Sequence, residues 1–300
     1  MTENEIISIL TESGPVTGAQ LVEKTRMEVL SLWRACRKAS SIRLKTAGCR
    51  FLRLDRNVEG YARLSPSIRR EFLTYTFVGV EGQAGELDAK VDALGGEISR
   101  ISELKREIAG ESVVSAISFL QDKDTILDKA CFILAGDVVY NMSHTVPRPE
   151  KSTGEMVQGS DLDIVVVAED DLNPAAVESL DKAIHKKKHL LLVNDREEID
   201  YLIKSMSRVR EQLRFDIFSS MVACKILNEG EFLYGNRAVY QKVKQLIDEF
   251  QIPDSLKALE EEAKSRREAA EVELRDGCER EDQSECYNLF YTRAEEDEIY

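Results

Sequence analysis

The sequence predicts an α/β (α+β) protein with a small N-terminal domain, a mixed sheet with flanking helices, and a helical C-terminal extension. Three observations support this fold class. The apolar run at 162–167 is typical of a buried strand. Residues 3–54 hold short helical stripes and then alternating apolar and basic residues, as a hairpin does. Residues 256–273 are dense in Glu, Lys and Arg at helical spacing, which predicts a solvated helix.

Composition describes a globular chain of 300 residues, long enough for two domains. No apolar run approaches the roughly 20 residues that span a bilayer, so no membrane partner is expected. The N-terminus is acidic and lacks the pattern of a signal peptide, which predicts a cytoplasmic location. The six cysteines are scattered, so we expect reduced thiols, and only three histidines argue against a zinc site.

The charge is unevenly distributed along the chain. Residues 1–80 hold 13 Lys or Arg and 8 Asp or Glu, a net charge of +5. The whole chain carries −14, so the remainder carries −19. This asymmetry indicates a division of labour between the two ends.

The first 54 residues predict helices at 3–12, 18–25 and 27–40, with Thr17 as the N-cap of the second. A β-hairpin around Gly48 is expected from 42–45 and 50–54. Three helices and a basic hairpin resemble a winged helix-turn-helix domain, in which the third helix enters the DNA major groove. The resemblance implies nucleic-acid contacts by Arg34, Arg37, Lys38, Arg43, Lys45, Arg50 and Arg53. The alternative is a winged helix that makes protein contacts, its charges merely solvated.

The glycine-rich stretch 79–85 is the clearest linker candidate. An amphipathic stripe from Leu87 to Ile108 then predicts a helix, which forms a coiled-coil homodimer contact or packs against its own chain. The expected division is therefore 1–80, a linker and amphipathic helix at 81–111, a catalytic domain at 112–250 and a charged extension at 251–300.

Two carboxylates, Asp161 and Asp163, precede the apolar run. Residues i and i+2 of a strand share a face, so both side chains project together while Leu162 points into the core. Neighbouring carboxylates repel unless a cation lies between them, and Mg²⁺ prefers oxygen ligands. A short strand expected at 214–218 would add Asp216 as a third ligand. Asp-x-Asp before a strand is also common without any metal.

Gly154, then Ser160-Asp161-Leu162-Asp163 with an apolar tail and the later Asp216, resembles the polymerase-β-like nucleotidyltransferase superfamily. The resemblance covers about 113–250. It departs from the family at the Gly-Ser pair that usually stands shortly before the position of Gly154. The nearest candidate here is Gly136-Asp137, 18 residues upstream of Gly154.

The resemblance implies transfer of a nucleoside monophosphate from a triphosphate such as ATP to a hydroxyl, with Mg²⁺ or Mn²⁺ as cofactor. The acceptor is a tRNA or other RNA end, a protein or a small molecule, and a toxin-like or phage-defence role is open. The implied catalytic and metal-binding residues are Asp161, Asp163 and Asp216. The expected nucleotide contacts are Gly136, Arg148, Lys151, Gly154, Gly159 and Ser160. The alternative is a DNA-binding transcriptional regulator whose nucleotidyltransferase-like domain senses a nucleotide.

Later segments complete the prediction. A helix is expected to run from 170 to about 186, and the basic stretch 185–189 either closes it, where cations suit the helix dipole, or binds substrate RNA. A short strand at 190–193 and a helix at 195–213 should follow. In the tail, the apolar residues at 287–291 are expected to dock on the body, while 295–300 stays loose.

Overall fold

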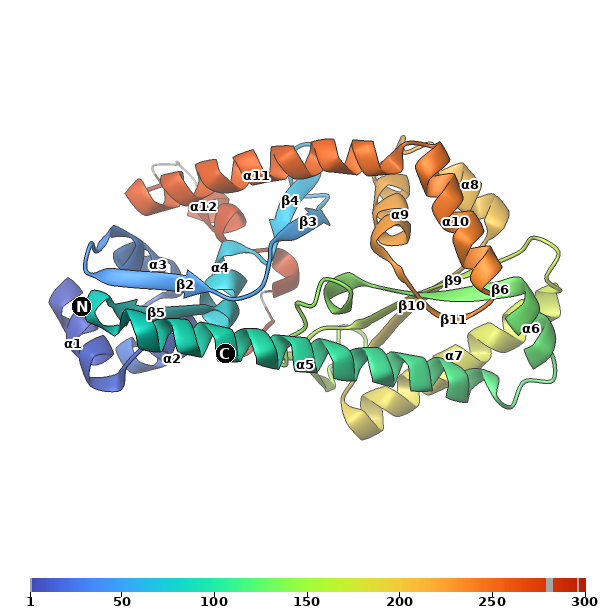
Figure 1. The fold of residues 1–300 in the computed structure, drawn as a ribbon, viewed down its shortest axis with the longest axis horizontal. Coiled ribbons are helices and arrows are strands. Elements are labelled where there is room, and N and C mark those ends of the chain that lie inside the picture. The colour runs from blue at the N-terminus through green and yellow to red at the C-terminus, as the bar shows by residue number, and fades with distance from the viewer. Residues whose placement is uncertain (1, 279–282, 296) are drawn as a thin grey trace. The chain divides into compact units, whose positions relative to one another are not determined.

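The computed structural model describes residues 2–278, 283–295 and 297–300 of a mixed α/β protein (Figure 1). The chain forms two compact units. The first unit comprises Met1–Arg53, Ala62–Ile98 and Glu260–Tyr300. The second comprises Leu54–Tyr61 and Ser99–Leu259. No helix in the described part of the chain is long and apolar enough to cross a membrane.

The first unit begins with three short helices and a three-stranded antiparallel sheet of order β1-β5-β2. The helices match the predicted ones closely. Thr17 caps the second helix as expected, because its hydroxyl accepts from the Gln20 amide at 3.2 Å while the Gln20 side chain accepts from the Thr17 amide at 3.0 Å. The elements are α1 (Glu3–Ser13), β1 (Val16–Thr17), α2 (Gly18–Thr25), α3 (Val29–Lys38), β2 (Ile42–Thr46) and β5 (Thr76–Val80).

The expected hairpin around Gly48 is wrong. Strand β2 pairs with β5, while β3 (Phe51–Leu54) pairs with β4 (Ala62–Ser65), and α4 (Ile68–Arg70) with the π-helical η1 (Glu71–Tyr75) leads into β5. The turn chemistry lies after β3, where the Asp55 carboxylate accepts from the Asn57 amide at 2.9 Å. Alternation marked both strands correctly, but it does not choose a strand's partner.

The glycine-rich stretch 79–85, the linker candidate, has regular secondary structure. Gly79 lies in β5, the 3₁₀ turn η2 spans Glu81–Gln83, and α5 (Ala84–Ile117) begins directly after it. The Gln83 side chain accepts from the Val80 amide at 3.1 Å, which closes the turn before the helix. The predicted amphipathic helix is confirmed and longer than expected, with Leu87, Val91, Ile98 and Ile101 buried.

The second unit is built on a four-stranded mixed sheet of order β10-β9-β6-β11. Strand β10 runs parallel to β9, whereas β6 is antiparallel to both β9 and β11. Residues of α5 and α7 pack with Ile164 and Val166 on one face, and α8, α9 and α10 contact the sheet from its other side (Figure 1). The strands are β6 (Ala130–Ala135), β9 (Leu162–Ala168), β10 (Ile199–Ser205) and β11 (Glu231–Gly235), with a separate hairpin of β7 (Pro147–Pro149) and β8 (Met156–Gln158). The helices are α6 (Lys123–Lys129), α7 (Pro174–Asp195), α8 (Met206–Gln212), α9 (Phe218–Glu229) and α10 (Arg237–Glu249). Helix α11 (Ile252–Asp276) begins in this unit and continues into the first.

Two strands predicted between 190 and 218 are wrong, and the helix predicted at 195–213 is confirmed only over α8 (Met206–Gln212). The stretch 190–193 belongs to α7, and its mixed burial, with Leu190 and Val193 exposed and Leu191 and Leu192 buried, is that of a helix at a surface. Strand β10 replaces the first half of the helix expected at 195–213. The strand expected at 214–218 is instead the loop between α8 and α9 and the first residue of α9.

The C-terminal segment packs on the first unit through α11 and α12 (Gln283–Phe290). The predicted docking of the apolar tail residues is confirmed, because the rings of Phe290 and Trp33 meet edge to face with centroids 5.9 Å apart. The expected looseness of 295–300 is wrong for its described residues. Glu295 and Glu298 are buried and form ion pairs with Arg70, and the Ser67 hydroxyl donates to Glu295.

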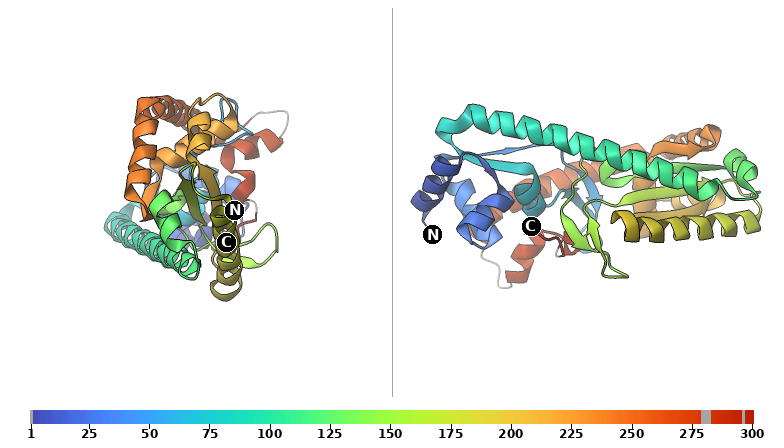
Figure 2. Two further views of the ribbon diagram at one scale, coloured as in Figure 1. Left: turned by 90° about the vertical axis from the view of Figure 1, so that its right-hand side faces the viewer. Right: turned by 90° about the horizontal axis from the view of Figure 1, so that it is seen from below.

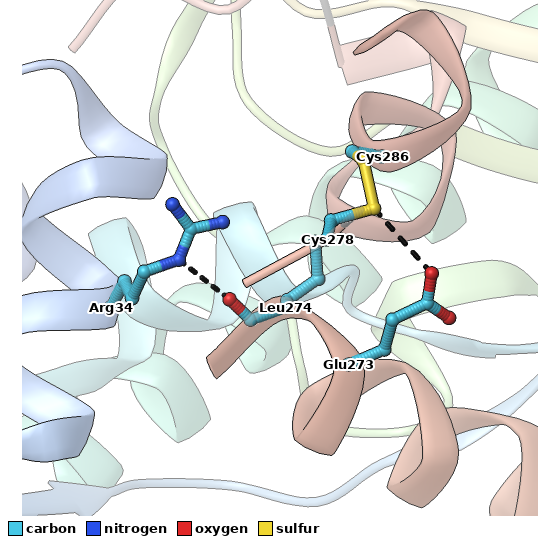
Figure 3. The surroundings of a disulfide bond; sticks show 5 residues. All are labelled: Arg34, Glu273, Leu274, Cys278 and Cys286. Atoms are coloured by element: carbon cyan, nitrogen blue, oxygen red, sulfur yellow. Dashed lines mark hydrogen bonds between the residues drawn. A yellow bond between two sulfur atoms is a disulfide. The ribbon is translucent and has the colours of Figure 1, made fainter. Parts of the chain in front are cut away.

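The expectation that the cysteines are reduced is wrong for one pair. Cys278 and Cys286 form a disulfide (Figure 3), whereas Cys36, Cys49, Cys131 and Cys224 are not in disulfides. The bond ties the end of α11 to α12, although residues 279–282 between them lie outside the described residues. The sequence contained no Cys-x-x-Cys pair, so only the path of the chain brings these two thiols together.

Candidate functional site

The centre of the candidate site is a pair of carboxylates on adjacent parallel strands of the second unit. Asp163 on β9 and Asp200 on β10 are direct register partners, each the second residue of its strand. Register partners in adjacent strands project to the same face, so both carboxylates lie on one face of the sheet, at the N-terminal ends of β9 and β10. We call this region the acidic edge. Asp163 is half-buried and Asp200 is exposed, which leaves the pair open to a ligand.

Gly136 and its neighbour complete the floor of this site. Gly136 follows β6 with φ +74°, and a Cβ there would collide with the Asp163 carboxylate. Only glycine therefore fits between the turn and the carboxylate. The next residue, Asp137, accepts a hydrogen bond from the Ser160 hydroxyl at 2.8 Å, and the His144 amide donates to the same hydroxyl at 3.2 Å. Gly136 and Ser160, predicted as nucleotide contacts, thus both lie at this edge.

The electrostatics show uncompensated negative charge around Asp163. Burial, followed by repulsion from Asp137, Asp200 and Glu229, raises the pKa of Asp163 to about 7, and Lys225 opposes the shift. A carboxyl group at this pKa is only partly ionised near neutral pH. A cation placed here would relieve the repulsion.

The predicted phosphate ligand Arg148 is engaged with carboxylates. From β7 it forms ion pairs with Asp161 and with Glu198, the latter at 2.9 Å. Lys188 of α7 lies 3.9 Å from the other oxygen of Glu198. On the far side of Asp163, Lys225 forms an ion pair with Glu229 within α9, and the Tyr140 hydroxyl donates to the same carboxylate. These cations partly neutralise the acidic edge.

A buried lysine fixes the loop that leads into β9. The Lys105 ammonium, on α5, donates to the Glu197 carboxylate at 2.6 Å, to the Ser160 carbonyl at 2.8 Å and to the Gln158 carbonyl at 3.0 Å. Its side chain is only 2% exposed. Burial lowers the pKa of Lys105 and raises that of Glu197, so the pair carries a desolvation cost that its hydrogen bonds offset. Lys105 therefore holds in place the backbone that leads into Asp161 and Asp163.

The remaining predicted site residues lie apart from Asp163 or have other partners. Asp216 is exposed in the loop before α9, and the register partner of Asp163 is Asp200. Lys151 and Gly154 lie exposed in the connection of the β7–β8 hairpin, and a Cβ at Gly154 would meet nothing within 4 Å. Gly159, with φ +70°, lies against the His144 carbonyl.

Sequence reasoning missed Asp200, Glu229 and Lys225 as site residues. The signal for Asp200 was present, because Ile199, Tyr201 and Ile203 alternate with polar or exposed residues as a strand requires. In sequence, Asp137 stands out only because it occupies the position of the Ser in the family's Gly-Ser pair.

The carboxylate oxygens of this site are ligands of the kind that a hard divalent cation prefers, but their side chains do not form a preformed metal-binding group. Within the described residues, no three His, Cys, Asp or Glu side chains form a group that could hold a metal ion. Carboxylate oxygens nevertheless dominate the edge, and three cations, Arg148, Lys188 and Lys225, lie among six carboxylates. The six are Asp137, Asp161, Asp163, Glu198, Asp200 and Glu229. A hard cation at this edge would relieve the charge imbalance that raises the pKa of Asp163.

The predicted nucleic-acid-binding residues of the first unit are largely engaged by their own chain. Arg37 and Arg50 pair with Glu271 of α11, and Arg50 also pairs with Glu71. The Arg34 guanidinium donates to the Leu274 carbonyl at 2.7 Å (Figure 3). Two exposed pairs, Arg43–Glu81 and Lys45–Asp88, involve residues near the start of α5, while Lys38 and Arg53 interact electrostatically with Asp276 and Glu295.

Comparisons with known proteins find no matching family model, no matching curated protein and no matching solved structure.

Proposed function

We propose that the chain is a metal-dependent nucleotidyltransferase that transfers a nucleoside monophosphate from a nucleoside triphosphate to a hydroxyl acceptor. The observation that carries the proposal is the in-register pair Asp163 and Asp200, with Gly136 against the Asp163 carboxylate. The carboxylate pair on this mixed sheet supports the resemblance to the polymerase-β-like superfamily that the sequence motif suggests. The three helices and three-stranded sheet of the first unit support a winged-helix interpretation.

The order of residues around the glycine supports the resemblance beyond the sequence motif. The 18 residues from Gly136 to Gly154 contain the 3₁₀ turn η3 (Gly136–Val138) and β7, so the chain leaves the sheet and returns to it. Gly136 thereby reaches Asp163 despite its distance in sequence. In this proposal Gly136-Asp137 takes the place of the family's Gly-Ser pair, and Ser160 supplies a hydroxyl beside it.

The proposed reaction is an in-line attack on the α-phosphorus. The acceptor oxygen forms a bond to phosphorus, the bond to the bridging oxygen breaks, and pyrophosphate leaves with the electron pair. When bound, Mg²⁺ would lower the pKa of the attacking hydroxyl and neutralise charge on the phosphates. Asp161, Asp163 and Asp200 would hold the cation, and Asp200, the exposed member, would accept the proton of the acceptor hydroxyl.

Arg148 and Lys225 are the cations suited to the triphosphate. Both now pair with carboxylates of the edge, Arg148 with Asp161 and Lys225 with Glu229. If a divalent cation were bound at Asp161, Arg148 would be able to exchange that carboxylate for a phosphate, to which a guanidinium is well matched.

A transfer assay tests the proposal. The full chain is incubated with Mg²⁺ or Mn²⁺, each α-labelled nucleoside triphosphate and total cellular RNA, after which RNA, protein and small molecules are separated. Asp163→Asn and Asp200→Asn should abolish labelling, whereas Asp216→Asn serves as the matched control and should retain it. Loss of labelling in the Asp216 variant alone would overturn the assignment of Asp200.

One observation favours a second candidate, a nucleotide-sensing regulator. The Arg148–Asp161 ion pair satisfies a carboxylate that a catalytic site needs free. In a sensor, labelled nucleotide binds the wild-type chain but no label is transferred to any fraction. The same assay, read after a binding step, therefore separates the two candidates.

A further inference from the structure

The C-terminal segment covers one face of α3 in the first unit (Figures 1 and 2). The ring of Phe290, in α12, packs edge to face on Trp33 of α3, and the two side chains are only 1% and 2% exposed. The end of α11 contributes as well, because Ala270 and Leu274 belong to the same apolar cluster as Trp33. Two C-terminal helices therefore shield this face of α3 from solvent.

The polar contacts at this face engage basic residues of α3. The Arg34 guanidinium donates to the Leu274 carbonyl at 2.7 Å (Figure 3), and Arg37 lies 3.5 Å from the Glu271 carboxylate. Leu274 is in the last turn of α11, where carbonyls lack partners within the helix and a cation suits the helix dipole. Arg34 therefore closes the end of α11.

The charges of the two partners are complementary. Residues 271–300 hold 11 Asp or Glu and three Lys or Arg, a net charge of −8, whereas residues 1–80 carry +5. The C-terminal segment thus gives α3 the negative charge that an external acidic partner would otherwise have to bring. While the segment is docked, Arg34 and Arg37 are engaged by their own chain.

The disulfide between Cys278 and Cys286 holds this cover together. Cys278 lies two residues after the end of α11, while Cys286 lies in α12 and is buried in the apolar cluster that contains Trp33. The two cysteines are eight positions apart in sequence, so the bond removes conformational entropy that an undocked α12 would gain. For a ring this short, loop entropy favours the docked state by about 10- to 100-fold.

A reductant can reach the disulfide from one side. Cys278 is half-buried, whereas Cys286 is only 7% exposed. All six cysteines lie within the described residues, and Cys36, Cys49, Cys131 and Cys224 are not in disulfides. A dithiol therefore has this one bond as its target in the chain.

We propose that the Cys278–Cys286 disulfide is a redox switch that controls the docking of α12 on α3. A thiolate of a dithiol reductant attacks the Cys278 sulfur, the S–S bond breaks, and Cys286 leaves as a thiolate that takes up a proton. The second thiol of the reductant then attacks the mixed disulfide and releases Cys278 as a thiol. Two electrons pass to the protein, and the dithiol is oxidised to a disulfide.

Reduction of the bond uncovers the shielded face of α3. Undocking of α12 removes Phe290 from Trp33, and the last turn of α11 frays and frees Arg34. The residues after α12 are anchored separately, since Arg70 pairs with Glu298, so the chain end stays attached and reoxidation can restore the docked state. The switch does not depend on the proposed transfer activity.

Fluorescence of Trp33, the single tryptophan of the chain, tests the switch in the full-length protein. Acrylamide should quench Trp33 weakly in the oxidised protein, and its quenching constant should rise at least about threefold after treatment with dithiothreitol. Cys278→Ser/Cys286→Ser should match the reduced wild type without reductant, and reoxidation should restore the original wild-type value. The matched control Cys49→Ser changes an exposed cysteine outside the disulfide and should respond to the reductant as the wild type does.

Hydrogen exchange separates undocking of α12 from a general loosening of the unit. In the reduced protein, the amides of α12 should exchange faster, while those of α3 and of the three-stranded sheet should stay protected. Unchanged quenching of Trp33 in both the reduced wild type and Cys278→Ser/Cys286→Ser overturns the proposal. An equal loss of protection in α3 and α12 also overturns it, because the disulfide would then stabilise the whole unit and not control one contact.

Discussion

Replacing Asp163 by Asn should stabilise the fold while removing the proposed activity. The pKa of Asp163 is raised by burial and by repulsion from Asp137, Asp200 and Glu229. Between the ordinary pKa of 3.8 and about 7, the folded chain retains a proton that the unfolded chain releases. The free energy of unfolding must therefore fall as pH rises through this window, and the stabilisation that comes from the proton retained on Asp163 is fully lost above about pH 7.

The size of the effect follows from the two pKa values. They differ by about three pH units, and about 1.4 kcal/mol per unit sets an upper bound of about 4 kcal/mol. Partial access of solvent and relaxation of the neighbouring carboxylates reduce this, so we expect about 1–2 kcal/mol at about pH 8. An amide at position 163 has nearly the same shape and carries no charge, so the variant avoids this loss.

Urea unfolding of both proteins measures the prediction. The free energy of unfolding of Asp163→Asn should exceed that of the wild type at about pH 8, and the difference should shrink toward about pH 5. Addition of Mg²⁺ should stabilise the wild type more than the variant and reduce the difference at the higher pH. A variant less stable than the wild type at about pH 8, or a difference independent of pH, would refute the electrostatic account of this site.

Two further predictions concern residues that support the site. Lys105→Met removes three hydrogen bonds and leaves Glu197 buried without its cation, so the free energy of unfolding should fall by about 3 kcal/mol. The control Lys264→Met removes a cation from an exposed ion pair and should lower the free energy of unfolding by less than about 1 kcal/mol. If urea unfolding shows the same loss of unfolding free energy in both variants, the buried hydrogen bonds of Lys105 do not stabilise the fold. Gly136→Ala forces a Cβ against Asp163, so it should abolish transfer and lower the free energy of unfolding by about 1–3 kcal/mol. Gly154→Ala imposes the same backbone strain, but its Cβ meets no other atom, so this variant should keep its activity.

The central strand and the N-terminal helices could be predicted from sequence. The apolar run of β9 and the capping box at Thr17 are local signals, and the structure contains both elements. The sequence does not predict β10, because the apolar stretch before it, Leu190 to Val193, has the stronger strand pattern. The burial pattern of a helix arises in this stretch because the sheet covers one face of α7, so the sequence alone does not distinguish the helix from a strand.

The candidate site was predictable only in part for a related reason. Asp163 stands within a local motif, but its partner depends on which strand lies beside β9. Pairing of β9 with β10 is a long-range choice, so Asp216 was selected where Asp200 is the register partner. The docking of Glu295 and Glu298 on Arg70 was likewise invisible, because an acidic tail has the composition of a disordered segment.

Titration of the full chain with Mn²⁺, followed by electron paramagnetic resonance, tests most directly whether the acidic edge is a metal site. Free Mn²⁺ gives a strong signal that is lost on binding, so the measurement needs neither nucleotide nor acceptor. The wild type and Asp216→Asn should bind Mn²⁺ with the same affinity, while Asp163→Asn and Asp200→Asn should lose at least about tenfold. Unchanged binding in Asp200→Asn together with loss in Asp216→Asn would contradict the site described here.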